Sequence, residues 1–280
     1  MARSGGIAYR AELPVGTGGA PTVVEDTLFV PAVDGSIYLL TARSGAGAAR
    51  KTPYKVDHPL AGSPCVTESL VVVGSADGLI YALDRASGAV KWIYRCRAPD
   101  QLPSEGSTYG VYSPLLAADG ALFAMTGAGD LYRFSASAPD AAGPEFGDFQ
   151  PEGGSAMPGG GYVGISFSVA DDGSGVDGAS IKATIDGSAV KITFDPVTGE
   201  VASLAAPLPD GAHLVKVSAA DYRGNESSTE WSFVTDASLI PVQQQPGVPG
   251  QRGAIGQQGT RRAPGGQTGQ GTRGVPGGGY

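Results

Sequence analysis

The chain has 280 residues, of which 45 are Gly and 21 are Pro, and its formal net charge is −8 at pH 7. This length allows two small domains and a tail. The last 40 residues hold four Arg and no acidic residue, so the acidic excess lies in the preceding part. An acidic body without a basic patch argues against nucleic-acid binding. No stretch approaches the run of about 18 apolar residues that a membrane span requires.

A repeated unit organises the first half of the chain. Residues 63–97, SPCVTESLVVVGSADGLIYALDRASGAVKWIYRCR, hold four short apolar runs separated by turn signals such as Asp77-Gly78 and Ser87-Gly88. This pattern predicts one antiparallel sheet with hairpin connections. Related patterns lie 43 residues earlier, at Asp34-Gly35, and about 50 residues later, near Gly129. A period of about 40 to 50 residues with four strands is typical of a β-propeller blade.

The repeats predict an all-β fold with an incomplete propeller of about three four-stranded blades over residues 1–135. Residues 4–9 match Ser87 to Trp92 and so predict an outer strand, while the first repeat has Ala49 where Trp92 stands and the third has lost its ending. Three explanations stay open: a longer protein, a ring completed by other copies, or an open stack. An open stack leaves sheet edges unprotected.

The segment DGLIYALDRASGAVKW resembles the repeat of the quinoprotein-dehydrogenase-like, or PQQ-like, propellers, in which the residue at Trp92 packs between blades. The resemblance covers about residues 4–135. Such repeats occur in enzymes that hold pyrroloquinoline quinone and in cofactor-free proteins, including outer-membrane assembly factors, so they imply a fold rather than a chemistry. The enzymes need a calcium, an Asp base and cations around the ring axis. None of these roles is assigned here, because the polar residues in the repeats share no motif: Asp34, Asp77, Lys51 and Arg133.

A linker and a second β domain follow. Residues 136–160 are rich in Ala, Pro, Gly and Ser without periodicity, which predicts a linker. Residues 161–236 alternate apolar and polar side chains between turn signals, and about seven such strands predict a β-sandwich. The motifs from Asp171 to Asp177 and from Leu208 to Asn225 resemble those of bacterial immunoglobulin-like modules. The resemblance implies a spacer or adhesive unit outside the cell.

Residues 237–280 are predicted to be a collagen-like disordered tail. Five unbroken Gly-X-Y triplets begin at Gly247, but the register then fails at Arg262 and Thr268. Interrupted triplets with almost no apolar side chains favour disorder. A trimerising or surface-attaching tail is the alternative.

Residue types that carry chemistry are scarce. Cys65 and Cys96 fall on the first and last strands of one blade, about 14 Å apart, whereas a disulfide needs Cα atoms within about 7 Å. Buried free thiols are therefore expected. His58 and His213 form no set with a nucleophile and an acid, and His213 is interpreted as a structural residue.

Carboxylates give the one candidate for a metal. Asp171, Asp172 and Asp177 crowd one turn, and Asp221 is expected near it at the same end of the sandwich. Such a group suits calcium, which takes six to eight oxygens. Tight turns need the same residues, and this is the favoured interpretation. No catalytic, cofactor-binding or metal-binding residue is therefore assigned, and no cofactor is expected.

These patterns predict a non-catalytic secreted or cell-surface protein that lies outside the cell or in the cell envelope and binds other proteins or surface polymers. One alternative is the C-terminal fragment of a quinoprotein-like enzyme or sensor whose active-site blades are absent. Another is a structural subunit that assembles with itself through its blade edges.

Overall fold

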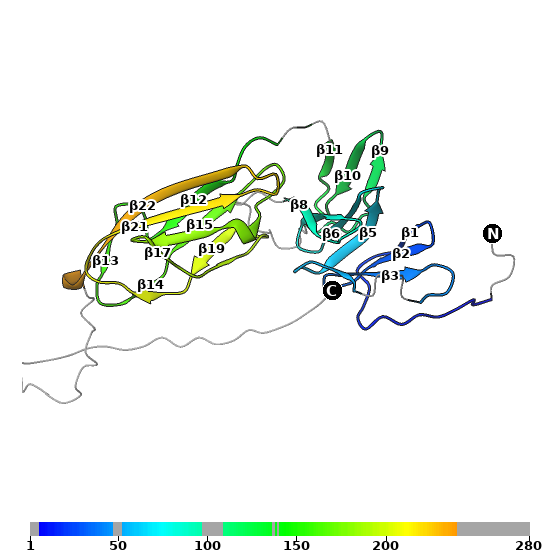
Figure 1. Cartoon of the computed structure of the whole chain (residues 1–280), viewed down its shortest axis with the longest axis horizontal. Helices are drawn as coiled ribbons and strands as arrows, with labels where there is room; N and C mark the ends of the chain where they lie inside the picture. Colours follow the sequence, from blue (N-terminus) through cyan, green and yellow to red (C-terminus); the bar gives the residue numbers. More distant parts are fainter. Residues whose placement is uncertain (1–5, 47–51, 97–108, 136–137, 139, 240–280) are drawn as a thin grey trace, which may run out of the picture. The chain divides into compact units, whose positions relative to one another are not determined.

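A computed structural model describes residues 6–46, 52–96, 109–135, 138 and 140–239 (Figure 1). The described residues form strands and two short 3-10 turns, η1 (Gly178–Ser180) and η2 (Ala237–Leu239). They contain no helix of the length and apolarity needed to cross a membrane. The predicted all-β class is confirmed. The predicted tail lies outside the described residues, apart from its first three.

The unit around Asp77-Gly78 is one antiparallel sheet, as predicted, and is called blade 2 here. Gly78 and Gly88 have φ of +87° and +75°, a left-handed backbone that favours glycine and lets the strands reverse tightly. Its four strands pair in chain order: β5 (Leu60–Val66), β6 (Leu70–Ser75), β7 (Leu79–Asp84) and β8 (Val90–Arg95).

Blade 1 and blade 3 flank this unit in the sequence. Blade 1 is a second four-stranded sheet, made of β1 (Thr22–Val24), β2 (Thr27–Pro31), β3 (Ser36–Thr41) and β4 (Tyr54–Lys55). Blade 3 has three strands among the described residues, in the order β11-β10-β9, which leaves β11 at an edge. These strands are β9 (Leu116–Ala118), β10 (Ala121–Met125) and β11 (Leu131–Ser135).

Blade 2 is apolar on both faces because it packs between its neighbours. Val73 and Tyr81 lie in a cluster with Phe29 and Ile37 of blade 1. The alternate residues of the same strands lie in a second cluster with residues of blade 3. There the ring of Trp92 stacks on Phe134, with centroids 5.6 Å apart, which agrees with the predicted packing role of Trp92.

A tyrosine on the outer strand β4 also joins blade 1 to blade 2. The hydroxyl of Tyr54 donates to the carbonyl of Arg85, and its ring lies where a Cβ on Gly88 would stand. The sequence comparison placed the outer-strand aromatic position of blade 1 at Ala49, which lies outside the described residues. The structure instead gives this role to Tyr54, five residues later in the chain.

The second domain is a sandwich of two sheets that enclose one core. One sheet has the order β12-β15-β19-β18 and the other β13-β22-β21-β16-β17, with β14 and β20 as a separate pair. Its strands are β12 (Glu145–Gln150), β13 (Ala156–Pro158), β14 (Tyr162–Val163), β15 (Ser166–Ala170), β16 (Lys182–Ile185), β17 (Ser188–Ala189), β18 (Ile192–Phe194), β19 (Glu200–Ser203), β20 (Ala206–Pro207), β21 (Gly211–Ala220) and β22 (Glu226–Asp236).

The prediction of a linker over 136–160 is wrong for residues 145–158. β12 pairs with β15, and β13 pairs in parallel with β22. Phe146, Phe149 and Met157 pack against the sandwich core, and the indole of Trp231 donates to the carbonyl of Pro151 at 3.0 Å. These contacts order a segment whose composition alone resembles a linker.

Phe167 in β15 is central to the sandwich core, with 1% of its surface exposed. We expect Phe167→Ala to lower the free energy of unfolding by about 3–5 kcal/mol, since it leaves a cavity between the sheets. Urea unfolding followed by the fluorescence of Trp231, which packs on Phe167, measures the change. Leu204, which is 71% exposed, supplies the control, because its Ala variant should stay within about 0.5 kcal/mol. Equal effects of the two changes would contradict this assignment of the core.

Candidate functional site

Two similar loops lie at one end of the sandwich, and each begins with an aspartate directly after a strand, β15 or β21. The Oδ1 of Asp171 accepts N–H groups from Gly173 and Gly175, at 3.0 and 2.7 Å. Asp221 follows β21 and uses its own Oδ1 in the same way, for the N–H groups two and four residues later, both at 2.8 Å. Aspartate folds such loops because its short side chain reaches the backbone just ahead.

Backbone contacts bring the two loops together. Val176 and Asp221 form an isolated β-bridge, and the N–H of Tyr222 donates to the carbonyl of Gly175 at 3.1 Å. Asp140 joins them, since its Oδ2 accepts the N–H of Ser174 at 2.7 Å. One carboxylate oxygen from each of Asp140, Asp171 and Asp221 lies within 4.8 Å of the others. We call these three residues the acidic loop cluster.

Burial and like charge act together on this cluster. Burial raises the pKa of Asp171, the negative charges of Asp140 and Asp221 raise it further, and the hydrogen bonds from Gly175 and Gly173 oppose both effects. Asp221 is 3% exposed, and its Oδ2 also accepts the side-chain amide of Asn225 at 2.6 Å. Backbone N–H groups and the side-chain amide of Asn225 thus stabilise these carboxylates.

The structure brings only some of the predicted acidic residues together. Asp171 and Asp221 come together as expected. Asp172 is exposed and lies outside the cluster. Asp177 instead caps η1, where its side chain accepts the N–H of Ala179. Asp140 was missed, because it lies in the predicted linker and no local motif marks it.

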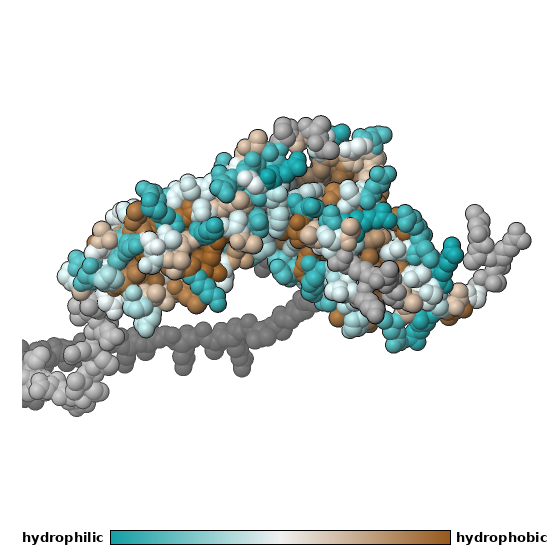
Figure 2. Space-filling view, viewed as in Figure 1, coloured by the Kyte–Doolittle hydropathy of each residue, from teal (hydrophilic) through white to brown (hydrophobic). Residues whose placement is uncertain are grey.

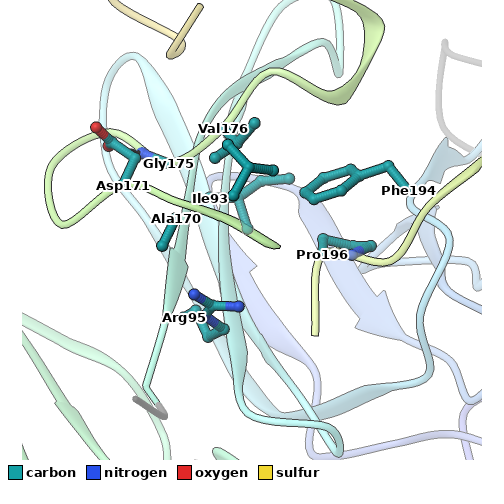
Figure 3. A pocket seen from close by; sticks show the side chains of 9 residues that line it. Ile93, Arg95, Ala170, Asp171, Gly175, Val176, Phe194 and Pro196 are labelled. Carbon is teal, nitrogen blue, oxygen red and sulfur yellow. Dashed lines mark hydrogen bonds between the residues drawn. The ribbon is translucent and has the colours of Figure 1, made fainter. Parts of the chain in front are cut away.

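A small cavity adjoins the loop that contains Asp171 (Figure 3). Its volume is about 30 Å³, and Figure 3 shows Ile93 and Arg95 of β8 lining it together with Val176 and Phe194 of the sandwich. The carboxyl group of Asp171 points away from Phe194 in this view. A volume of this size has room for a few water molecules, since one water needs about 10–15 Å³, and it is small beside pockets that hold organic ligands.

Both histidines contact polar groups of the fold. His213 is 2% exposed, and its Nδ1 lies 2.7 Å from Oδ2 of Asp186. Its Nε2 lies 2.9 Å from the carbonyl of Pro209 and 2.9 Å from the hydroxyl of Thr235. In blade 2, the Nδ1 of His58 lies 2.8 Å from the hydroxyl of Tyr81, whose pKa is raised chiefly by burial.

The two cysteines are free and buried, as predicted. Burial raises the pKa of the Cys65 thiol. Burial, with the charge of Asp130, raises the pKa of Cys96 to about 12. A thiolate is the nucleophilic form, so neither residue is activated for covalent chemistry at neutral pH.

The polar residues of the blades serve turns and ladders. Asp34 accepts both the N–H and the hydroxyl of Ser36, each at 3.0 Å, which closes a hairpin of blade 1. Asp77 occupies the corresponding turn of blade 2, and Arg133 lies on β11. Lys51 lies outside the described residues.

Comparison with known proteins supports the fold of the first half. Residues 1–138 match the protein-family model described as "Outer membrane protein assembly factor BamB". No curated protein matches the chain. These residues therefore carry the predicted PQQ-like β-propeller repeat.

Several solved structures resemble the chain. BamB from Moraxella catarrhalis is 16% identical with a TM-score of 0.36, and the match covers 81% of this chain and 65% of that one. A quinohemoprotein alcohol dehydrogenase from Pseudomonas putida is 14% identical with a TM-score of 0.34, covering 76% and 30%. CopC from Methylosinus trichosporium is 18% identical with a TM-score of 0.28, covering 33% and 93%.

The pair of His213 and Asp186 predicts a pH-dependent stability. The hydrogen bond from His213, with that from the N–H of Leu214, holds the pKa of Asp186 below its usual 3.8. The ionised Asp186 carboxylate therefore stabilises the folded state fully above about pH 3.8. This stabilisation is lost as the pH falls through the lower pKa that Asp186 has in the folded state. We expect Asp186→Asn to lower the free energy of unfolding by about 1–3 kcal/mol at pH 7. Urea unfolding at pH 7, 5 and 3 should show the difference from wild type narrowing only at pH 3.

Glu230→Gln is the matched control for this change. Glu230 pairs with Lys216 at 2.8 Å on an exposed face, and such pairs contribute about 0–1 kcal/mol. A penalty for Asp186→Asn that stays constant from pH 7 to pH 3 would rule out the ionised carboxylate of Asp186 as its source.

The donors around the acidic loop cluster predict that it needs no cation. We expect the full chain to have the same melting temperature, within about 1 °C, in EDTA and in 10 mM calcium. A calcium site with a dissociation constant of about 1 mM would instead raise the melting temperature by several degrees. Scanning calorimetry with a magnesium control measures this. A calcium-specific rise, abolished by Asp221→Asn, would overturn the expectation.

Proposed function

We propose that this chain is a non-catalytic protein of the cell envelope or the extracellular space, and that its blades and sandwich serve as binding or scaffolding surfaces for proteins or surface polymers. One observation carries the proposal: the described side chains best suited to catalysis are engaged within the fold. His213 contacts three polar groups, and both thiols are buried. The clustered carboxylates accept backbone donors.

Two further observations support the proposed location. The family model matched by residues 1–138 is described as an outer-membrane protein assembly factor, and a scaffold in the envelope accords with that description. The motifs at Asp171–Asp177 and Leu208–Asn225 resemble immunoglobulin-like modules of surface proteins. An adhesive or spacer role for the sandwich is part of the proposal.

The outer face of one sandwich sheet offers a candidate binding surface. A shallow groove of about 480 Å³ crosses β16, β21 and β22, and Lys182, Lys216 and Glu230 line it together with serine and threonine hydroxyls. Hydrophilic side chains cover much of the surface in Figure 2, with apolar ones between them. A groove of hydroxyls and mixed charges suits an extended polar chain better than an apolar small molecule.

Fractionation of the source cells tests the proposed location. With an antibody raised against the purified chain, we expect the protein in the envelope fraction or the medium. A cytosolic enzyme serves as the marker for leakage. Recovery of the chain with that marker would contradict the proposed location.

Titration with pyrroloquinoline quinone separates the proposal from the quinoprotein interpretation. We expect no saturable change in quinone absorbance when the full chain is added in excess calcium, because the described residues of the blades offer no shared set of cofactor ligands. A known quinoprotein is the positive control. Saturable binding of the quinone would contradict the non-catalytic proposal and favour the alternative that the chain is a fragment of a quinoprotein-like enzyme.

A further inference from the structure

Blade 3 presents an apolar sheet face that no described residue covers. Leu116, Phe123 and Arg133 lie side by side across its three strands, and Met125 pairs with Leu131 in the next row. Leu116, Met125 and Leu131 are 63%, 44% and 69% exposed. The alternate residues of these strands pack against blade 2. We call the five exposed-side residues the outward face of blade 3.

The corresponding positions are buried in the other two blades. Leu131 corresponds to Ile80 in blade 2 and to Ile37 in blade 1, and both isoleucines are 0% exposed. Phe123 corresponds in the same way to Val72, which is 2% exposed. Each of these buried residues faces the next blade in the chain. The outward face of blade 3 therefore has the position of a surface that contacts a following blade. Its composition also fits, except at Arg133, which stands where blade 2 has the buried Ala82.

Blade 1 carries the complementary surface. Tyr38 and Leu40 correspond to Tyr81 and Leu83 of blade 2, which are buried in the cluster shared with blade 1. Tyr38 and Leu40 themselves are only half-buried. The side of blade 1 that faces away from blade 2 is thus built like a surface that receives a preceding blade.

Residues 6–9 resemble an outer strand in sequence but join no sheet among the described residues, and blade 3 has no described outer strand. The hydroxyl of Tyr9 donates to the carbonyl of Ala42 and its ring covers Gly45, which repeats the contact that Tyr54 makes from β4 to blade 2. Ile7 is 88% exposed, and residues 6–9 have no strand partner among the described residues. The outer edge of β11 likewise lacks a paired strand in the described part of the chain (Figure 1).

We propose that two copies of this chain close one six-bladed ring from their three blades each. The outward face of blade 3 of each copy packs on blade 1 of the other, and residues 6–9 of the other copy add to β11 as its fourth strand. Strand addition gives the outer edge of β11 a hydrogen-bonded neighbour, and packing removes exposed apolar side chains from water. This inference goes beyond the proposed function and does not depend on it.

A second copy is the occupant that fits both surfaces at once. Consecutive blades pack through one type of interface, and the outward face of blade 3 and the free side of blade 1 are the two halves of that interface. They therefore complement each other as blade 1 complements blade 2. Propellers close with about four to eight blades, which two copies satisfy and three copies exceed. A head-to-tail interface that closes after two copies gives a finite assembly rather than a filament.

The solution mass of the full chain tests the ring. We expect light scattering after gel filtration to give twice the 28.1 kDa of one chain. Leu131→Asp should weaken the dimer by about 100-fold or more, because the interface would bury a carboxylate in place of an apolar side chain. Leu204→Asp, at an equally exposed leucine of the sandwich, should leave the mass unchanged. A monomer at every concentration up to about 100 μM would overturn the proposal, as would an open-ended polymer.

Complementation between variants tests the head-to-tail arrangement. Ile7→Pro removes a backbone donor from the added strand and should also produce monomers. Each variant alone damages both interfaces of its own dimer. A mixture of Ile7→Pro with Leu131→Asp leaves one interface intact, so the two variants should associate with each other more tightly than either does with itself. Failure of the mixture to associate, with the wild type dimeric, would exclude this arrangement.

Discussion

A β-sheet that is apolar on both faces is stable only between two neighbours, and blade 2 meets this constraint fully. Val73 and Tyr81 on one face pack against blade 1, while Val72 and Ile80 on the other pack toward blade 3. A blade apolar on both faces has no face left for water. Blade 1 and blade 3 are these two neighbours, and each is stabilised in turn by its contact with blade 2. The outer-strand aromatic residues Tyr54 and Trp92 add to these contacts.

Local turn chemistry made the blades predictable from the sequence. The Asp-Gly and Ser-Gly dipeptides mark positions where only a left-handed glycine lets adjacent strands reverse, and Gly78 and Gly88 adopt that conformation. Strand β12 gives no such local signal. Its partner, β15, is set by the register of Phe146 against Val169, across the intervening loops. The composition of residues 136–160, which is rich in Gly and Pro, therefore did not predict β12 and β13. Both strands are ordered by partners that lie far away in the sequence.

The acidic loop cluster shows the same division between local and distant information. Asp171 and Asp221 each organise the four residues that follow them, so a short sequence motif predicts their roles. Asp140 acts on Ser174 and, through its carbonyl, on Asn225, which lie 34 and 85 residues away. Nothing near Asp140 in the sequence encodes those partners. The site could thus be predicted in its two loops but not in the residue that joins them.

These carboxylates also show why clustered acids do not by themselves imply catalysis. An oxygen that accepts two backbone N–H groups, as Oδ1 of Asp171 does, has its lone pairs directed into the loop. Those bonds hold the carboxylate as part of the turn, while its second oxygen, Oδ2, makes neither of them. His213 is tied in the same way to Asp186 and Pro209. Blade 3 differs from these groups, because the part of the chain that the structure describes leaves one of its sheet faces and one of its strand edges exposed.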